Sequence, residues 1–190
     1  MGSITLVTGG ARSGKSTFAE QLASRREGTV LYIATSVATD EEMRSRIQAH
    51  QQARPKTWQT VEMYRGFELL LGNDDFHQAG TLLLDCVTIM VSNLLLESKL
   101  DFERCSMAEL GPVEDMVRGE VGALVELVRN QHKDLILVTN ELGMGLVPPY
   151  RLGRIFRDVA GRVNQYLAQA ADEVYLIVSG LPVKLKWGQQ

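Results

Sequence analysis

The stretch GGARSGKS, residues 9–16, matches the pattern G-x-x-x-x-G-K-[S/T] without a mismatch. It follows an apolar run at residues 4–8 and precedes a helical pattern. A strand that ends in a glycine-rich turn and enters a helix directs several backbone N–H groups at one point, at the positive end of the helix dipole. Such a point binds phosphate, so the sequence predicts a nucleoside triphosphate site. The alternative, a glycine-rich turn with a surface lysine, is disfavoured because strand and helix both flank it.

Individual residues of this phosphate loop have distinct expected roles. Lys15 is expected to reach the β- and γ-phosphate oxygens, and the Ser16 hydroxyl to ligate Mg²⁺. Gly14 lets the backbone pass close to the phosphates. Further along, the run TLLLD at residues 81–85 ends in Asp85, as in strands that bring a carboxylate beside a phosphate loop to hold Mg²⁺. The alternative is that Asp85 only caps the next helix. Beside a complete phosphate loop we favour the metal role.

Length and composition favour a soluble, cytoplasmic enzyme. The 190 residues are most simply one domain, with a net charge of −3 and 45% hydrophobic residues. This balance argues against a nucleic-acid coat protein and against disorder. The two cysteines, Cys86 and Cys105, lack the spacing of a disulfide framework or a zinc site. No apolar run reaches the ~18 residues that span a bilayer, and no leader pattern marks export.

Apolar patterning predicts strands that alternate with helices. Strands are expected at residues 4–8, 29–35, 57–63, 81–85, 134–140 and 173–179, with a short edge strand at 183–186. Helices are expected at residues 17–26, 40–54, 67–71, 87–97, from Pro112 onward, and at 150–171, with loops at 72–75 and 100–111. This order predicts an α/β fold with a mainly parallel sheet and helices on both faces. Ligands then bind at the carboxyl ends of the strands, where the phosphate loop, Thr35, Ser36, Asp85 and Asn140 are expected to converge.

Several polar side chains leave alternatives open. His50 continues the stripe of Met43 and Ile47 on the helix at residues 40–54, and periodicity alone favours a structural role for it. Asn140 either senses the γ-phosphate or is an ordinary turn residue. The arginines of the last long helix either meet phosphates or a neighbouring subunit, or form a solvated face, which is the default for Arg151, Arg154, Arg157 and Arg162.

Across nearly its full length the chain resembles the bifunctional adenosylcobinamide kinase and adenosylcobinamide-phosphate guanylyltransferase family. The phosphate loop occurs in many enzymes, whereas the other segments are more specific. The segments that carry the resemblance are TGGARSGKS at 8–16, YIATS at 32–36, RIQAHQQARP at 46–55, WQTVE at 58–62, LLLDCVTIMVSNLL at 82–95, VTNELGMGLVPPYRLGRIFRDVAGRVNQ at 138–165 and ADEVYLIVSGLPVKLK at 171–186.

The resemblance implies a RecA-like P-loop NTPase domain over residues 1–190 that acts in two steps. The hydroxyl of the aminopropanol arm of adenosylcobinamide is phosphorylated by ATP or GTP. A histidine, His50 here, then attacks the α-phosphate of GTP, releases pyrophosphate and passes GMP to adenosylcobinamide phosphate. Carried over residue by residue, the nucleotide-binding positions are Gly9, Gly10, Ala11, Arg12, Ser13, Gly14, Lys15, Ser16, Ala34, Thr35, Ser36, Gln51, Gln52, Ala53, Arg54, Glu62 and Asp85. A homotrimer is implied as well.

The residues suit this chemistry. Neutral imidazole, with an unperturbed pKa of about 6.5, is an available nucleophile at pH 7. We expect Arg46 and Arg54 to help orient the α-phosphate. Asp85 stands where some family members carry glutamate. The N-K-x-D guanine motif of switch GTPases is absent, so guanine preference is assigned to the neighbourhood of residues 35–36 and Glu62.

Two other functions remain as alternatives. In a one-step small-molecule kinase, only the γ-phosphate moves and His50 is structural. A RecA-like assembly or regulatory protein would bind a triphosphate in order to change partners, but only the expected fold supports it. The near-neutral charge and the lack of a basic or aromatic strand-binding tract disfavour a nucleic-acid partner.

Overall fold

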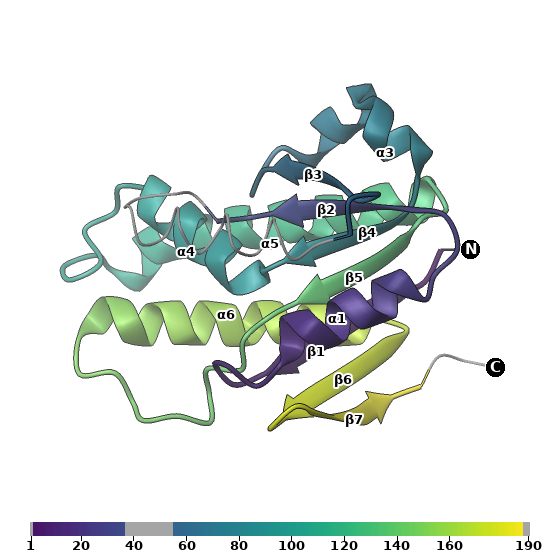
Figure 1. Cartoon of the computed structure of the whole chain (residues 1–190). Coiled ribbons are helices and arrows are strands. Elements are labelled where there is room, and N and C mark those ends of the chain that lie inside the picture. The colour runs from purple at the N-terminus through teal and green to yellow at the C-terminus, as the bar shows by residue number, and fades with distance from the viewer. Residues whose placement is uncertain (1, 37–54, 188–190) are drawn as a thin grey trace.

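A seven-stranded sheet organises the part of the chain that the computed structural model describes, residues 2–36 and 55–187. The strand order is β3-β2-β4-β5-β1-β6-β7 (Figure 1). Every neighbouring pair is parallel except β6 and β7, which are antiparallel. The strands are β1 Ile4–Gly9, β2 Thr29–Ala34, β3 Gln59–Glu62, β4 Ala79–Asp85, β5 Asp134–Val138, β6 Glu173–Val178 and β7 Leu181–Lys186.

Helices cover both faces of this sheet, as the strand and helix alternation predicts. The described helices are α1 Lys15–Ser24, the 3-10 helix η1 Phe67–Gly72, α3 Asp74–Gln78, α4 Val87–Glu97, α5 Met107–Asn130 and α6 Arg151–Ala170. The sheet has a hydrophobic core on each face, and alternate residues along a strand belong to different cores. Val7, Val30 and Leu83 pack with α1 in the smaller core, whereas their neighbours along the strands face α4, α5 and α6.

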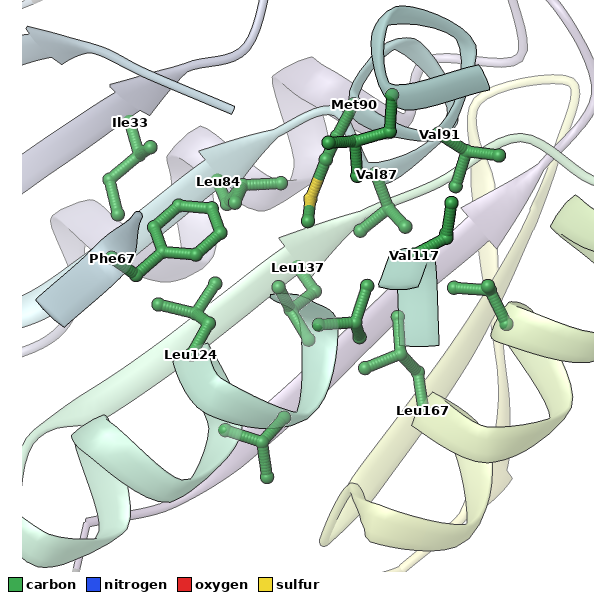
Figure 2. Close-up of a cluster of buried hydrophobic side chains, with 14 of the residues drawn as sticks. Ile33, Phe67, Leu84, Val87, Met90, Val91, Val117, Leu124, Leu137 and Leu167 are labelled. Atoms are coloured by element: carbon green, nitrogen blue, oxygen red, sulfur yellow. The ribbon is translucent and has the colours of Figure 1, made fainter. Parts of the chain in front are cut away.

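The larger core accounts for the fully apolar strands. Ile33, Leu84 and Leu137 project from three adjacent strands toward Phe67 of η1 and Leu124 of α5 (Figure 2). All five side chains are at most 2% exposed. Because the central strands are covered on both sides, they read as continuous apolar runs rather than alternating ones.

Most predicted elements are confirmed, and helix α4 has the predicted bounds. Three local expectations are wrong. Residues 72–75 were expected as a loop, but Asn73 accepts a hydrogen bond from the Phe76 N–H and so caps α3. The strand expected at 57–63 is confined to the four residues of β3.

The third wrong expectation concerns the start of α5. The helix begins at Met107, not at Pro112, because Ser106 and Glu109 form a reciprocal capping box. Pro112 therefore lies inside the helix, where it cannot donate to the carbonyl one turn earlier. The predicted loop at 100–111 is correspondingly shorter.

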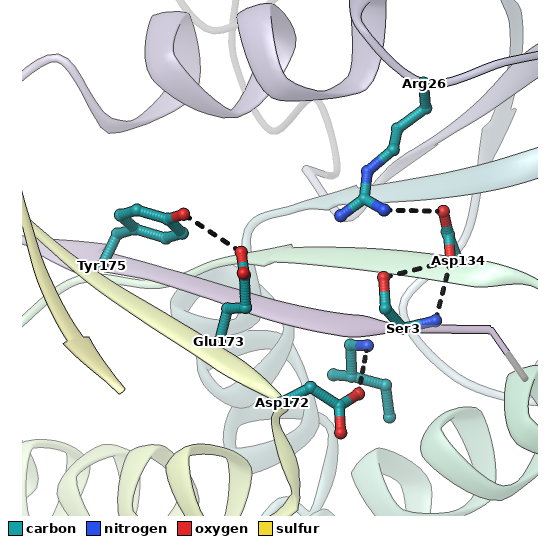
Figure 3. Close-up of polar contacts among 7 residues, drawn as sticks. Ser3, Arg26, Asp134, Asp172, Glu173 and Tyr175 are labelled. Atoms are coloured by element: carbon teal, nitrogen blue, oxygen red, sulfur yellow. Dashed lines mark hydrogen bonds and ion pairs between the residues drawn. The ribbon is translucent and has the colours of Figure 1, made fainter. Parts of the chain in front are cut away.

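The amino ends of the strands are joined by polar contacts (Figure 3). The Asp134 carboxylate accepts hydrogen bonds from the Ser3 N–H at 2.7 Å and the Ser3 hydroxyl at 3.1 Å, and pairs with Arg26 at 3.1 Å. Asp172 accepts from the Ile4 N–H at 2.8 Å. These contacts connect the beginnings of β1, β5 and β6. None of the helices described is long and apolar enough to cross a membrane.

Replacing Asp134 with alanine should lower the free energy of unfolding by about 2 kcal/mol, because two donors of Ser3 and the Arg26 guanidinium lose a charged acceptor. Denaturant unfolding measures the change. Asp115→Ala is the matched control. Its carboxylate pairs with Arg118 on the exposed surface of α5, so it should cost less than about 0.5 kcal/mol. Equal losses in the two variants would contradict the importance of the Asp134 contacts.

Candidate functional site

The register of the sheet aligns four strand ends at one edge. Ala34 pairs with Asp85, and Asp85 pairs with Val138. Val138 also pairs with Val7, two residues before the first glycine of the phosphate loop. The residues that follow β1, β2, β4 and β5 therefore leave the sheet at the same edge, as the parallel pattern predicts.

The phosphate loop requires glycine at two positions. Gly9 has a φ of 154°, and a Cβ there would lie 2.5 Å from the Ile177 carbonyl oxygen. Gly14 has a φ of 95° in the left-handed region and forms the N-cap of α1. The Gly180 N–H donates to the Ser13 carbonyl at 2.8 Å, so the turn between β6 and β7 holds the outer side of the loop.

Lys15 lies within this loop and is only 7% exposed. Its Nζ donates a hydrogen bond to the Gly10 carbonyl at 2.6 Å. Burial lowers the pKa of Lys15, while the neighbouring Cys86 and Asp85 act in the opposite direction. The lysine is thus held against the loop backbone, close to the carboxylate at the end of β4.

Asp85 is half-buried and accepts a hydrogen bond from the Tyr32 hydroxyl at 3.1 Å. The N-cap of α4 is Cys86, with no side-chain cap bond, so Asp85 does not cap this helix. The capping alternative for Asp85 is therefore wrong, and its metal role stays a prediction. Burial, followed by the charge of Asp85, raises the pKa of the Cys86 thiol to about 11, so the thiol stays protonated and weakly nucleophilic at neutral pH.

Thr35, which follows β2, is held entirely by protein groups. Its hydroxyl donates to the Cys86 carbonyl and accepts from the Cys86 N–H, both at 2.8 Å. Its own N–H donates to the Asp85 carbonyl at 3.3 Å, and its carbonyl accepts from Asn93 Nδ2 at 2.8 Å. The Thr35 side chain therefore joins the ends of β2 and β4, and its nucleotide contact stays a prediction.

The remaining predicted positions divide into two groups. Ser16 and Ser36 are half-buried, Ala34 is buried, and Glu62 is exposed at the end of β3 opposite Ala34. Gly10, Ala11 and Arg12 are exposed on the phosphate loop. The other group lies outside the described residues and includes Met43, Arg46, Ile47, His50, Gln51, Gln52, Ala53 and Arg54.

The arginines of α6 contact protein groups while staying partly exposed or, for Arg162, exposed, so the alternatives left open for them stay predictions. Arg151 donates to the Cys105 carbonyl at 2.5 Å, and Arg154 donates to the Pro148 and Pro149 carbonyls at 3.1 and 2.7 Å. Arg162 pairs with Glu114 of α5 through two nitrogens. Arg157 lies 3.6 Å from Asp158. These contacts fix the loop before α6 and join α6 to its neighbours.

Sequence reasoning missed the polar side chains that hold the site together. Asn93 lies in the apolar run of α4. An amide is unexpected there, so the sequence could have indicated that Asn93 binds a buried polar group. Thr88, Thr139 and Asn164 form a hydrogen-bonded group at the end of β5. Their partners are distant in sequence, so spacing gave no signal for them.

A family model described as cobinamide kinase / cobinamide phosphate guanyltransferase matches residues 5–185. The chain belongs to this family. It is 47% identical over 181 residues to a bifunctional adenosylcobalamin biosynthesis protein of Escherichia coli (strain K12), covering 95% of this chain and 98% of that one. It is 48% identical over 183 residues to the protein of the same name from Salmonella typhimurium, with the same coverage.

Among solved structures, the chain is similar to the PH0250 protein of Pyrococcus horikoshii OT3. The TM-score is 0.53 at 10% sequence identity, with 99% of this chain and 88% of that chain covered. At this identity the likeness concerns the fold alone. The fold of this member of the kinase and guanyltransferase family is thus the predicted α/β fold, with a P-loop at the carboxyl edge of a mainly parallel sheet.

Replacing Thr35 with valine should destabilise the protein by about 2 kcal/mol, because valine keeps the shape but leaves both backbone groups of Cys86 without their partner. Thr35→Ser keeps the hydroxyl and should cost about 1 kcal/mol, for the lost methyl group. Denaturant unfolding of both variants measures the difference. A serine variant less stable than the valine variant would contradict the role given to the hydroxyl.

Proposed function

We propose that this chain phosphorylates adenosylcobinamide with ATP or GTP, and then transfers GMP from GTP through His50 to adenosylcobinamide phosphate. The observation that carries the proposal is a complete phosphate loop, with Lys15 and Asp85 beside it, in a chain whose family is described by these two reactions. The products of the second reaction are adenosylcobinamide-GDP and pyrophosphate.

The phosphate loop supports the kinase step by binding and orienting the triphosphate. Successive N–H groups at the start of α1 offer donors to phosphate oxygens, and the helix dipole favours their charge. Ser13 Oγ is buried without a hydrogen-bond partner among the described residues, as expected of a group completed by a ligand. Lys15 exchanges the neutral Gly10 carbonyl for charged phosphate oxygens and offsets the charge that develops on them.

The donor groups available near the loop fit Mg²⁺. The Ser16 hydroxyl and the Asp85 carboxylate are hard oxygen ligands, and this ion commonly takes one or two protein ligands together with substrate phosphates. When bound, Mg²⁺ would supply positive charge that reduces the repulsion of the phosphates toward an incoming nucleophile. The acceptor hydroxyl of the cobinamide attacks the γ-phosphorus in line and loses its proton to water, while the bond from that phosphorus to the bridging oxygen breaks and the nucleoside diphosphate leaves.

The second step is assigned to His50 as nucleophile. A neutral imidazole nitrogen forms a bond to the α-phosphorus, and the bond from that phosphorus to the bridging oxygen breaks to release pyrophosphate. A phosphate oxygen of adenosylcobinamide phosphate then attacks the same phosphorus, and the nitrogen–phosphorus bond breaks. Arg46 and Arg54 are assigned to orienting the α-phosphate, and Glu62 with residues 35–36 to the guanine. A cytoplasmic homotrimer completes the proposal.

The covalent step is tested by intact-mass measurement after incubation with GTP and Mg²⁺. The wild type should gain the mass of one GMP, in a linkage that is labile to acid and stable to base. His50→Ala should gain none, because alanine has no nucleophilic nitrogen. His132→Ala is the control, since His132 is exposed in the turn after α5 and its replacement should leave labelling intact. Labelling of His50→Ala would contradict the assignment, and phosphorylated cobinamide without any GDP-linked product would indicate a one-step kinase.

The role of Lys15 is tested by Lys15→Met in the kinase reaction. Loss of the charge that faces the developing phosphate charge should reduce kcat by roughly 10²–10³-fold. Initial rates of nucleoside diphosphate release with adenosylcobinamide measure the effect. Lys99→Met, at an exposed position after α4, makes the same substitution away from the loop and should leave the rate unchanged. A Lys15→Met rate near the wild-type value would remove Lys15 from the reaction.

A further inference from the structure

Three hydrogen-bonded side chains, those of Thr88, Thr139 and Asn164, lie around the backbone of Asn140, two residues past the end of β5. Thr139 and Thr88 are 0% and 5% exposed. Thr139 Oγ1 donates to Asn164 Oδ1 at 2.7 Å and lies 3.2 Å from Thr88 Oγ1. Because the Thr139 hydrogen is used by Asn164, the Thr88 hydroxyl is the donor in the second contact.

The same side chains bind both backbone polar groups of Asn140. The Asn140 N–H donates to Thr88 Oγ1 at 2.7 Å, and Asn164 Nδ2 donates to the Asn140 carbonyl at 3.0 Å. Asn164 therefore uses its oxygen on Thr139 and its nitrogen on Asn140. This arrangement connects the middle of α6, the end of β5 and the first turn of α4.

Residues 139–141 continue the pairing of β5 with β1 as far as the phosphate loop. The Thr139 N–H donates to the Val7 carbonyl at 3.0 Å, and the Glu141 N–H donates to the carbonyl of Gly9 at 2.9 Å. Gly9 is the first glycine of the loop. One side of the loop entrance is thus fixed by a segment whose own position depends on Asn164.

We propose that Asn164 is a positioning residue for the phosphate loop. It acts through the Asn140 backbone and the Glu141 to Gly9 hydrogen bond, and the hydrogen bonds of its own side chain are with Thr139 and Asn140. The inference rests on the proposed use of the loop for a triphosphate. Loss of the amide leaves buried polar partners unpaired, so the segment moves to find others. A displacement of about 1 Å in a positioning element is enough to cost roughly 10²-fold in rate.

The test combines Asn164→Leu, Thr139→Val and their double variant. Isothermal titration with a non-hydrolysable GTP analogue and Mg²⁺ gives the Kd, and the same preparations give the melting temperature and the KM and kcat of the kinase step. Each single variant should weaken nucleotide binding about tenfold and should also lower kcat. The reason is that each removes a hydrogen bond from the same set of side chains around Asn140. The Kd of the double variant should be within about twofold of the Kd of the single variant that binds more weakly, since the two side chains act together.

Two controls separate positioning from stability. Thr139→Ser keeps the hydroxyl, and Gln165→Leu alters the exposed residue next to Asn164, so both should bind the analogue within about twofold of the wild type. Asn164→Asp serves if the leucine variant does not fold, because it keeps the acceptor for Thr139 and loses the donor to Asn140. It should also weaken binding.

The outcomes distinguish this inference from the proposed function. Weaker binding and a lower kcat in Asn164→Leu or Asn164→Asp and in Thr139→Val, with values near those of the wild type in Thr139→Ser, would support positioning. A lowered melting temperature with wild-type Kd and kcat would show a merely structural role and overturn the inference alone. A wild-type protein that binds no analogue would overturn the proposed function, and the inference with it.

Discussion

Parallel hydrogen bonding between β1, β5, β4 and β2 is the constraint on which the rest of the site depends. Because the pairing is in register, residues that are far apart in the chain leave the sheet at one edge. Backbone hydrogen bonds then continue past the strand ends, from Glu141 to Gly9 and from Thr35 to Asp85. The phosphate loop is consequently attached to a sheet that is buried on both faces, and it inherits that rigidity.

The two edges of the sheet differ in kind. At the amino ends, Asp134 and Asp172 satisfy backbone donors with charged side chains and tie three strands together. At the carboxyl ends, the neutral side chains of Thr35, Asn93 and Asn164 donate hydrogen bonds to backbone carbonyls. These three contacts fix the backbone without adding to the negative charge of Asp85 at the edge where an anionic ligand is expected.

The sequence predicted the sheet, the helices on both faces and the edge at which the candidate residues meet, because these follow from apolar patterning and from one strongly constrained loop. It failed where two local patterns competed. Pro112 resembled a helix start, but the capping box of Ser106 and Glu109 lies earlier and satisfies more backbone groups. The hydroxyl of Thr35 and the amide of Asn164 escaped prediction for another reason, since their partners come from other elements and only the folded chain brings them together.

In the proposed role of Lys15, its hydrogen bond to the Gly10 carbonyl implies a preference among ligands. A ligand that recruits this ammonium group must replace an acceptor already in place at 2.6 Å, so a neutral oxygen offers little net gain. A phosphate group shares its negative charge over its oxygens, and this charge makes the exchange favourable. The proposed phosphate-binding role of Lys15 thus implies discrimination against nucleosides and other uncharged compounds of similar shape, before any contact to base or sugar is considered.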